Sequence, residues 1–349
     1  MSEAYLAEIA EQPGILDRLG ARFAASWGAA FAELRAGLAA GRFDRVILTG
    51  MGGSLHGAHP AHLALSRALS VPVLLWESGE LTQQAPQAVT PRTLVIAISQ
   101  SGESGEVKRL TELPARPGYA VTITNGSGNA LANWADLAVT TEAGPERTAS
   151  TKTYTAGLAA LHLVVAHLTG DGAGAGAEVQ AAAATVAAML ERMPAAAAAA
   201  AAHLGHDAAL TVIGRGDSFG TAAMAALLIE EAAKLSCEAL TGGQFRHGPL
   251  ELVRAGFRAV VFVGEGPARP LTEALVTRIA ELGGRVVTIG TDIGTGTDAV
   301  LPLDLPEVAP GLLPLIEIIP VQYLVIPLAL ARGFEPAAFL NARKITTGE

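Results

Sequence analysis

The chain contains two stretches in which short apolar runs alternate with segments of helical periodicity. In the first stretch, strands are expected at Arg45 to Thr49, Val71 to Trp76, Leu94 to Ile98 and Ala120 to Thr124. In the second, strands are expected at Leu210 to Ile213, Ala259 to Val263 and Val286 to Ile289. Strands that alternate with helices form parallel sheets, because each helix returns the chain to the same end of the sheet. The pattern therefore predicts an α/β protein with two tandem sheets.

The segments around these stretches are predicted to be helical. Residues 1–44 are rich in Ala, Leu and Glu. An alanine-rich linker is expected to form a helix broken at Pro194, since alanine is the best helix former. An apolar helix is expected at Leu315 to Ala331, ending near Gly333. We therefore divide the chain into an N-terminal helical segment (1–44), a first domain (45–170), a helical linker (171–205) and a second domain (206–349).

Each predicted sheet begins with a strand that leads into a glycine turn. The two turns are Gly50-Met51-Gly52-Gly53-Ser54 and Gly214-Arg215-Gly216-Asp217-Ser218. A polar loop, Ser99-Gln100-Ser101-Gly102-Glu103-Ser104, follows a later strand of the first copy alone. Loops after the strands of a parallel sheet meet at one edge, where helix N-termini and hydroxyl groups attract anions. These serines would otherwise serve as helix caps; for this set we favour an anion-binding loop.

Composition limits the other functions that the chain can have. Neither glycine turn completes a dinucleotide fingerprint and no phosphate-binding G-x-x-x-x-G-K-[ST] loop occurs. A net charge of −9 without basic runs argues against nucleic-acid binding. The single cysteine, Cys237, excludes an intramolecular disulfide, and the N-terminus lacks the pattern of a signal peptide. The most apolar segment, Leu312 to Ala331, contains Glu317 and three prolines, so no membrane span is expected. We expect a cytoplasmic protein.

Three charged residues are candidates for acid–base chemistry. In a helix expected over Thr221 to Glu238, Glu231 shares a face with leucines, where desolvation would make the carboxylate more basic; the alternative places its head in water. Glu230 falls elsewhere and is expected to pair with Lys234. His247 lies in a Gly- and Pro-bounded loop, where it would otherwise be a solvated surface group. Lys344 lies near the carboxyl end, where it would otherwise be a charge of the tail.

The histidines suggest no metal site. His56 and His59 come nearest to a ligand pair, but the eight histidines form no ligand-spaced cluster with acidic residues. Neither a metal nor a cofactor is expected.

Taken in order, these motifs resemble the sugar isomerase (SIS) domain family, in particular the isomerase half of glucosamine-6-phosphate synthase and its standalone relatives. The resemblance covers nearly all of residues 45–349. Its strongest motifs are Ser99 to Ser104, Ala149-Ser150-Thr151-Lys152, Gly214-Arg215-Gly216 and His247-Gly248-Pro249-Leu250. It implies two tandem flavodoxin-like subdomains. It also implies an isomerase that interconverts an aldose and a ketose carrying an anionic group at C6.

The resemblance also implies a role for each candidate residue. The positions that match the holders of the sugar 6-phosphate are Ser54, Ser99, Gln100, Ser101 and Ser104, and Gly52 joins this substrate-binding set. Thr148 and Ser150 match residues that line the sugar. Glu231 matches the base that moves a proton between C1 and C2, and Lys344 the tail lysine that meets the carbonyl, in some members as a Schiff base. His247 matches the ring-opening histidine, which in relatives comes from a second subunit, so a homodimer is expected.

Some positions depart from the pattern of the synthase. Leu228 stands where the synthase has a second lysine, Gln244 replaces an acidic residue, and Ala342-Arg343 resembles an insertion before Lys344. The sequence shows no N-terminal glutaminase domain, so glutamine is not expected as a built-in ammonia source. A glucosamine-6-phosphate deaminase, a fructosamine-6-phosphate deglycase and a non-catalytic sugar-phosphate regulator are the alternatives. The sequence leaves open whether the anion is a phosphate or a sulfonate.

Overall fold

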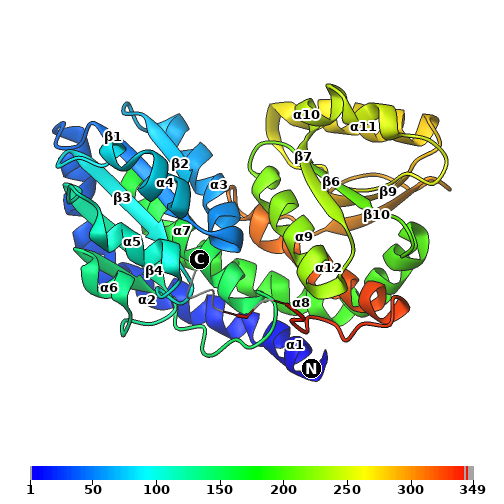
Figure 1. The fold of residues 1–349 in the computed structure, drawn as a ribbon, viewed down its shortest axis with the longest axis horizontal. Helices are drawn as coiled ribbons and strands as arrows, with labels where there is room; N and C mark the ends of the chain where they lie inside the picture. Colours follow the sequence, from blue (N-terminus) through cyan, green and yellow to red (C-terminus); the bar gives the residue numbers. More distant parts are fainter. Residues whose placement is uncertain (1, 342, 345–349) are drawn as a thin grey trace. The chain divides into compact units, whose positions relative to one another are not determined.

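The computed structural model describes residues 2–341 and 343–344, which form two compact units, each built around one parallel sheet (Figure 1). The first-sheet unit holds residues 11–146 and 150–184 and the described tail residues Asn341, Arg343 and Lys344. The second-sheet unit holds residues 2–10, 147–149 and 185–340.

Both sheets have the same topology. The first has the strand order β2-β1-β3-β4-β5 and the second β10-β9-β8-β6-β7, with every neighbouring pair parallel. Counted from its own first strand, each sheet follows the flavodoxin-like order 2-1-3-4-5. The predicted fold class is confirmed. The strands are β1 (Arg45–Gly50), β2 (Val73–Glu77), β3 (Thr93–Ile98), β4 (Tyr119–Thr124), β5 (Leu137–Thr140), β6 (Leu210–Gly214), β7 (Cys237–Thr241), β8 (Arg258–Phe262), β9 (Arg285–Thr291) and β10 (Val300–Leu305).

The three strands that the sequence pattern missed all lie at sheet edges. They are β5, β7 and β10. Their burial is partial, whereas β3 and β6 are buried along their whole length. An edge strand has fewer neighbours to cover its side chains, so it needs no continuous apolar run and leaves a weak signal in the sequence.

Helices cover both faces of each sheet (Figure 1). In the second-sheet unit, α10 and α11 lie on one side and α9 and α12 on the other. The α-helices are α1 (Ser2–Ala10), α2 (Gln12–Ala39), α3 (Gly52–Ala68), α4 (Ser78–Gln84), α5 (Gly105–Arg109), α6 (Ala130–Trp134), α7 (Lys152–Thr169), α8 (Gly172–Leu204), α9 (Ser218–Ala233), α10 (Gly242–Arg246), α11 (Arg269–Glu281) and α12 (Leu313–Ala331). Short 3₁₀ turns are η1 (Pro86–Ala88), η2 (Leu110–Glu112), η3 (Pro249–Leu252) and η4 (Gly266–Ala268).

Two helical predictions were wrong in detail. The alanine-rich helix α8 continues through Pro194 rather than breaking there, because the surrounding alanines sustain the helix around one missing N–H bond. The helix expected to reach Glu238 ends at Ala233, where Lys234 adopts a left-handed conformation with φ of 54°. Lys234 Nζ then donates to the carbonyls of Glu231 and Ala338 instead of pairing with Glu230.

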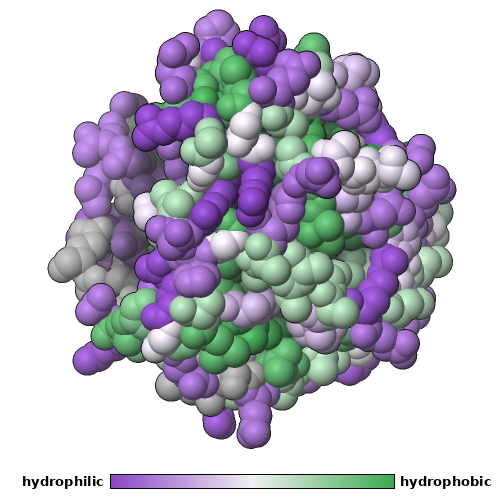
Figure 2. Space-filling model, turned by 90° about the vertical axis from the view of Figure 1, so that its right-hand side faces the viewer, coloured by the Kyte–Doolittle hydropathy of each residue, from purple (hydrophilic) through white to green (hydrophobic). Residues whose placement is uncertain are grey.

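The helix α12 lies in the core of the second-sheet unit. By length and composition, α8 and α12 are both apolar enough to cross a membrane. The apolar window of α12 is 83% buried inside the protein, which is typical of a core helix, and that of α8 is 33% buried. Where the structure describes side chains, the exposed large apolar ones are Leu6, Leu252, Leu271, Leu330 and Leu340. Figure 2 shows polar and apolar residues interspersed on the face that it presents.

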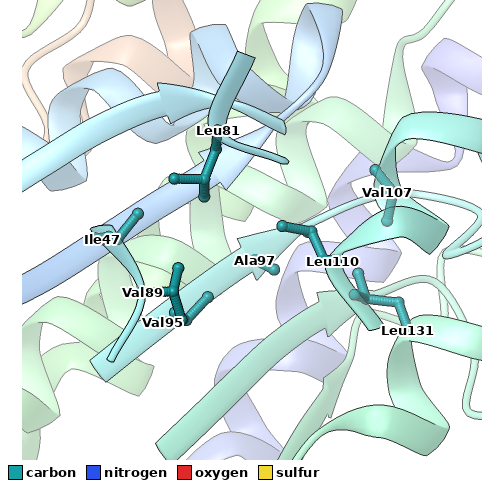
Figure 3. Packing of buried hydrophobic residues seen from close by; sticks show 8 residues of the cluster. All are labelled: Ile47, Leu81, Val89, Val95, Ala97, Val107, Leu110 and Leu131. Carbon is teal, nitrogen blue, oxygen red and sulfur yellow. The ribbon is translucent and has the colours of Figure 1, made fainter. Parts of the chain in front are cut away.

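A packed cluster on one face of the first sheet fixes the segments that follow its strands. Ile47, Val95 and Ala97 of β1 and β3 meet side chains from α4, α5, η2 and α6 (Figure 3). Val107, in the short helix directly after the Ser99 to Ser104 loop, is 1% exposed. Burying such a side chain stabilises the fold by about 1.5–3 kcal/mol, so the cluster anchors the polar loop from its far end.

Candidate functional site

The polar loop and the first glycine turn follow neighbouring strands of the first sheet. β1 and β3 pair in parallel with Gly50 opposite Ile98, so residues 51–54 and 99–104 leave the same edge. This edge is the topological switch point of the sheet, where chain connections diverge and ligands bind in such folds. Gly52 has φ of 47° and begins α3, and Ser54 lies in the first turn of that helix. The structure therefore brings the two predicted anion-binding segments to one edge.

Hydroxyl groups of the polar loop retain protons to donate. Ser99 Oγ accepts from Gly102 N at 3.1 Å and Ser101 Oγ accepts from Glu103 N at 3.1 Å. Ser104 is the N-cap residue of α5 but makes no side-chain cap bond. An accepting hydroxyl can still donate its own hydrogen. Ser99 is buried, whereas the other predicted anion-binding residues are half-buried: Ser54, Gln100, Ser101 and Ser104.

Neighbouring groups fix the backbone of this loop. Gly102 has φ of 64°, and a Cβ there would lie 1.9 Å from Asn129 Oδ1, so no larger residue fits without movement. Glu103 accepts from Ala130 N at 2.8 Å and pairs with Lys108 at 2.6 Å. The bond from Lys108 and that from Ala130 lower the pKa of Glu103, which therefore braces the loop as a carboxylate.

The C-terminal lysine lies beside one of the predicted sugar-lining residues. Lys344 Nζ is 3.1 Å from Ser150 Oγ and 2.5 Å from Glu146 Oε2, all within the first-sheet unit. Sequence reasoning singled out Lys344 and Ser150 but missed Glu146. No periodicity or motif in the sequence distinguishes Glu146 from a surface acid in the loop after β5.

Thr148, the other predicted sugar-lining residue, belongs to the second-sheet unit. It is 2% exposed, and its hydroxyl donates to the Glu8 carboxylate. The adjacent Arg147 N donates to the other oxygen of Glu8 at 2.6 Å. The Thr148 hydroxyl is therefore bound to a residue of α1, an arrangement that the sequence did not suggest.

Two of the predicted catalytic residues are held by α9 and α10 of the second-sheet unit. Glu231 is half-buried near the C-terminal end of α9. Burial lowers the pKa of Lys234, and the charge of the nearby Glu231 opposes that shift. His247 is exposed and follows α10, whose first turn is closed by a capping box between Thr241 and Gln244. Gln244, noted above for its departure from the family pattern, thus stabilises the helix that presents His247.

The second glycine turn has different surroundings from the first. Ser218 Oγ donates to Glu317 Oε1 at 2.7 Å, and Glu317 is completely buried on α12. Burial raises the pKa of Glu317 to about 8, the Ser218 and Thr221 hydroxyls oppose this, and the charges of Glu265 and Asp217 add to it. The Ser218 hydroxyl is thus already engaged by a buried carboxyl group of the protein. Of the two glycine turns, we therefore favour the first for an anionic ligand.

Metal-binding geometry is not found in the part of the chain that the structure describes: residues 2–341 and 343–344 include no group of three or more His, Cys, Asp or Glu side chains able to hold a metal ion.

The repeated sheet order and a hydroxyl-rich switch point define an α/β protein of the class that binds small ligands at strand ends. A family profile described as SIS domain matches residues 42–167 and 205–332. The chain belongs to this family.

One relative and two solved structures show the range of similar proteins. The glutamine–fructose-6-phosphate aminotransferase (isomerizing) of Pyrococcus horikoshii is 32% identical over 319 residues, 88% of this chain and 52% of that protein. The chain thus spans about half the length of this relative. The C-terminal domain of glucosamine-fructose-6-phosphate aminotransferase from Francisella tularensis superposes with a TM-score of 0.85 at 23% identity, covering 96% of this chain and 97% of that one. Tagatose-6-phosphate ketose/aldose isomerase from Escherichia coli superposes with a TM-score of 0.78 at 22% identity, covering 95% of this chain and 94% of that one. Both structures share the fold.

Proposed function

We propose that the protein is an isomerase that interconverts an aldose and a ketose carrying an anionic group, phosphate or sulfonate, at C6. The observation that carries this proposal is the position of Lys344, whose Nζ lies 3.1 Å from Ser150 Oγ in the unit that also holds the anion-binding edge. The names of the Pyrococcus relative, an isomerizing fructose-6-phosphate aminotransferase, and of the Escherichia coli isomerase support the same class of substrate.

The anion-binding edge fixes one end of the sugar in this proposal. Hydroxyl donors of Ser54, Ser99, Ser101 and Ser104, with Gln100, bind the anionic group. Hydrogen bonds to charged groups contribute about 1.5–3 kcal/mol each. The gain is mainly orientation, since a fixed C6 group places C1 and C2 at a constant distance from the edge.

The three predicted catalytic residues then divide the chemistry between them. His247 moves a proton from the anomeric hydroxyl to the ring oxygen, which opens the ring. Glu231 removes the proton from the carbon next to the carbonyl, which leaves an enediolate, and returns it to the former carbonyl carbon, while the hydroxyl proton passes from one oxygen to the other. The Lys344 ammonium stabilises the negative oxygen that develops. Acid–base catalysis by a positioned carboxylate contributes about 10²–10⁴-fold.

The composition of α9 favours isomerisation without amine transfer. Leu228, one turn before Glu231, is fully buried and apolar. It therefore brings no ammonium to the site at the position where the synthase has its second lysine. Ammonia or amine release from an amino sugar would instead support the deaminase and deglycase alternatives.

A cytoplasmic homodimer with a shared site is part of the proposal. His247 is exposed at the end of α10, and Leu252, in the turn that follows it, is 58% exposed. Exposed apolar and catalytic groups in one loop are suited to contact with a second copy of the chain. Light scattering on the purified protein tests this, and an active monomer would contradict it.

Glu231→Gln tests the role of the base. The amide keeps the size of the side chain but cannot accept the proton, so we expect turnover of the best phosphosugar to fall by about 10²–10⁴-fold. Binding of that sugar, measured by calorimetry, should stay within about twofold, since the anion-binding edge is untouched. Glu230→Gln is the matched control, because Glu230 is the exposed neighbour on the same helix. A Glu231→Gln protein as active as the control would remove Glu231 from the mechanism.

A further inference from the structure

Glu146 is a buried carboxylate to which the function described above gives no role. It lies in the loop between β5 and α7, and its side chain is completely buried. An ionised carboxylate is costly to bury unless hydrogen bonds and an opposite charge satisfy it. The surroundings of Glu146 therefore have to supply both.

The two oxygens of Glu146 have different partners. Oε1 accepts from Thr151 N at 2.9 Å, Thr151 Oγ1 at 3.2 Å and Thr153 N at 3.1 Å. Oε2 accepts from Thr153 Oγ1 at 2.5 Å and from Lys344 Nζ at 2.5 Å. The first oxygen thus shapes the local loop and the start of α7. The second faces a residue almost two hundred positions later in the chain.

The contact fixes the ammonium of Lys344 in space. A lysine side chain has four rotatable bonds and loses up to about 2 kcal/mol of conformational entropy when it is held in one arrangement. Nζ contacts both Glu146 Oε2 and Ser150 Oγ, at 2.5 and 3.1 Å. A catalytic group that is fixed before the substrate arrives does not have to be ordered during the reaction.

We propose that Glu146 is a positioning residue that holds the Lys344 ammonium against Ser150, where it meets the carbonyl oxygen of the bound sugar. This inference rests on the proposed function, since it takes Lys344 as the group that stabilises the developing charge. Because the Glu146 side chain is completely buried, it acts through Lys344 in this proposal.

A second lysine–carboxylate pair in the same unit provides a matched control. Lys152 Nζ lies 2.6 Å from Glu11 Oε2, but here the lysine is 2% exposed and the carboxylate 52% exposed. The carboxylate that holds Lys344 is enclosed, whereas the one that holds Lys152 faces water. Glu11→Gln therefore removes a similar ion pair without touching Lys344.

Glu146→Gln is the decisive variant, because the amide oxygen can still accept the three Oε1 bonds while the charge that faces Lys344 disappears. We expect kcat to fall about 10²-fold with KM changed less than about threefold, since a misplaced catalytic group costs that much. Glu146→Asp keeps the charge, so its kcat should be at least about tenfold higher than that of Glu146→Gln. Glu11→Gln should leave kcat unchanged.

A double-mutant cycle links the effect to the lysine. Lys344→Met removes the ammonium, and adding Glu146→Gln to it should lower kcat no further, since the two residues act as one unit. Additive losses, or a Glu146→Gln kcat equal to that of Glu11→Gln, would overturn the proposal.

Chemical labelling tests the positioning without any turnover. Acetylation by an amine-reactive ester, followed by peptide mass spectrometry, should modify Lys344 at least about fivefold faster in Glu146→Gln than in the wild type or Glu11→Gln, because a neutral amide holds the amine less tightly. Equal rates would show that Glu146 does not hold Lys344. A wild type that turns over no phosphosugar would reject the proposed function, while the labelling result still decides the contact.

Discussion

Two fully buried glutamates illustrate how different surroundings change the same side chain. Glu146 is satisfied by backbone N–H groups, threonine hydroxyls and an ammonium. Glu317 receives a hydroxyl bond from Ser218, and the charges beside it, Glu265 and Asp217, are negative. At Glu317, burial and these charges raise the pKa, so protonation of its carboxyl group is favoured.

The raised pKa of Glu317 predicts how stability changes with pH. The folded carboxyl keeps its proton up to about pH 8, whereas an unfolded one releases it near the ordinary value of 4.5. The folded state therefore binds more protons between these values, and stability falls as the pH rises through this window. The contribution of Glu317 is complete below about pH 4.5 and is lost above about pH 8.

Glu317→Gln tests this account. The amide does not titrate, so we expect the variant to lose less stability than the wild type between pH 5 and about pH 9, by an amount on the order of a few kcal/mol. Thermal unfolding of both proteins across this range gives the comparison. Parallel curves of Tm against pH would show that Glu317 does not titrate in this window.

At the scale of the element, the sequence predicted every interior strand and the edge strand β2, and missed the other three edge strands. The continuous apolar runs of β1, β3, β4, β6, β8 and β9 have neighbours on both sides, and burial on both faces selects such runs. The edge strands β5, β7 and β10 mix polar and apolar residues, which periodicity alone cannot separate from loops. At the end of α9, Lys234 Nζ donates to the local Glu231 carbonyl and to the carbonyl of Ala338, a residue distant in the sequence that local periodicity could not reveal.

The candidate site was predictable in part for the same reason. Hydroxyl-rich loops after buried strands leave a local signal, so Ser99 to Ser104 stood out from the sequence alone. The roles of Ser150 and Lys344 were implied by family resemblance, and their contact depends on the folded tail. Glu146 had no local signal, because its partners are a nearby turn and a residue at the far end of the chain.

Gly102 determines the backbone path of the Ser99 to Ser104 loop. Gly102→Ala places a Cβ 1.9 Å from Asn129 Oδ1 at a left-handed φ of 64°. The backbone conformation alone costs about 1–2 kcal/mol, and the clash adds to it. We expect a Tm lower by several degrees and at least about tenfold weaker binding of a phosphosugar, since a loop shifted by about 1 Å misplaces the serine hydroxyls.

Gly128→Ala is the control for this substitution. No atom lies within 4 Å of its added Cβ, and its φ is ordinary. Calorimetric unfolding and phosphosugar titration should give wild-type values for this variant. Equal effects of the two substitutions would mean that Gly102 does not shape the loop.

At the scale of the whole molecule, one sheet topology serves two purposes. Both units have the order 2-1-3-4-5, but the first presents hydroxyls at its switch point and the second presents the buried Glu317 beside Ser218. The first-sheet unit carries Ser99 to Ser104 and Lys344, and the second-sheet unit carries Glu231 and His247. The duplication thus provides two related frameworks with different chemistry at their edges.

The central claim is that this protein moves a proton between C1 and C2 of an anionic sugar. Proton NMR in D₂O tests it most directly, with glucose 6-phosphate, fructose 6-phosphate, glucosamine 6-phosphate, a phosphorylated fructosamine and a 6-sulfonated glucose as substrates. We predict that deuterium enters C1 or C2 of at least one sugar with the wild type and of none with Glu231→Gln. Absence of exchange with every sugar, together with thermal stabilisation by a phosphosugar, would contradict catalysis and identify a sugar-phosphate-binding regulator.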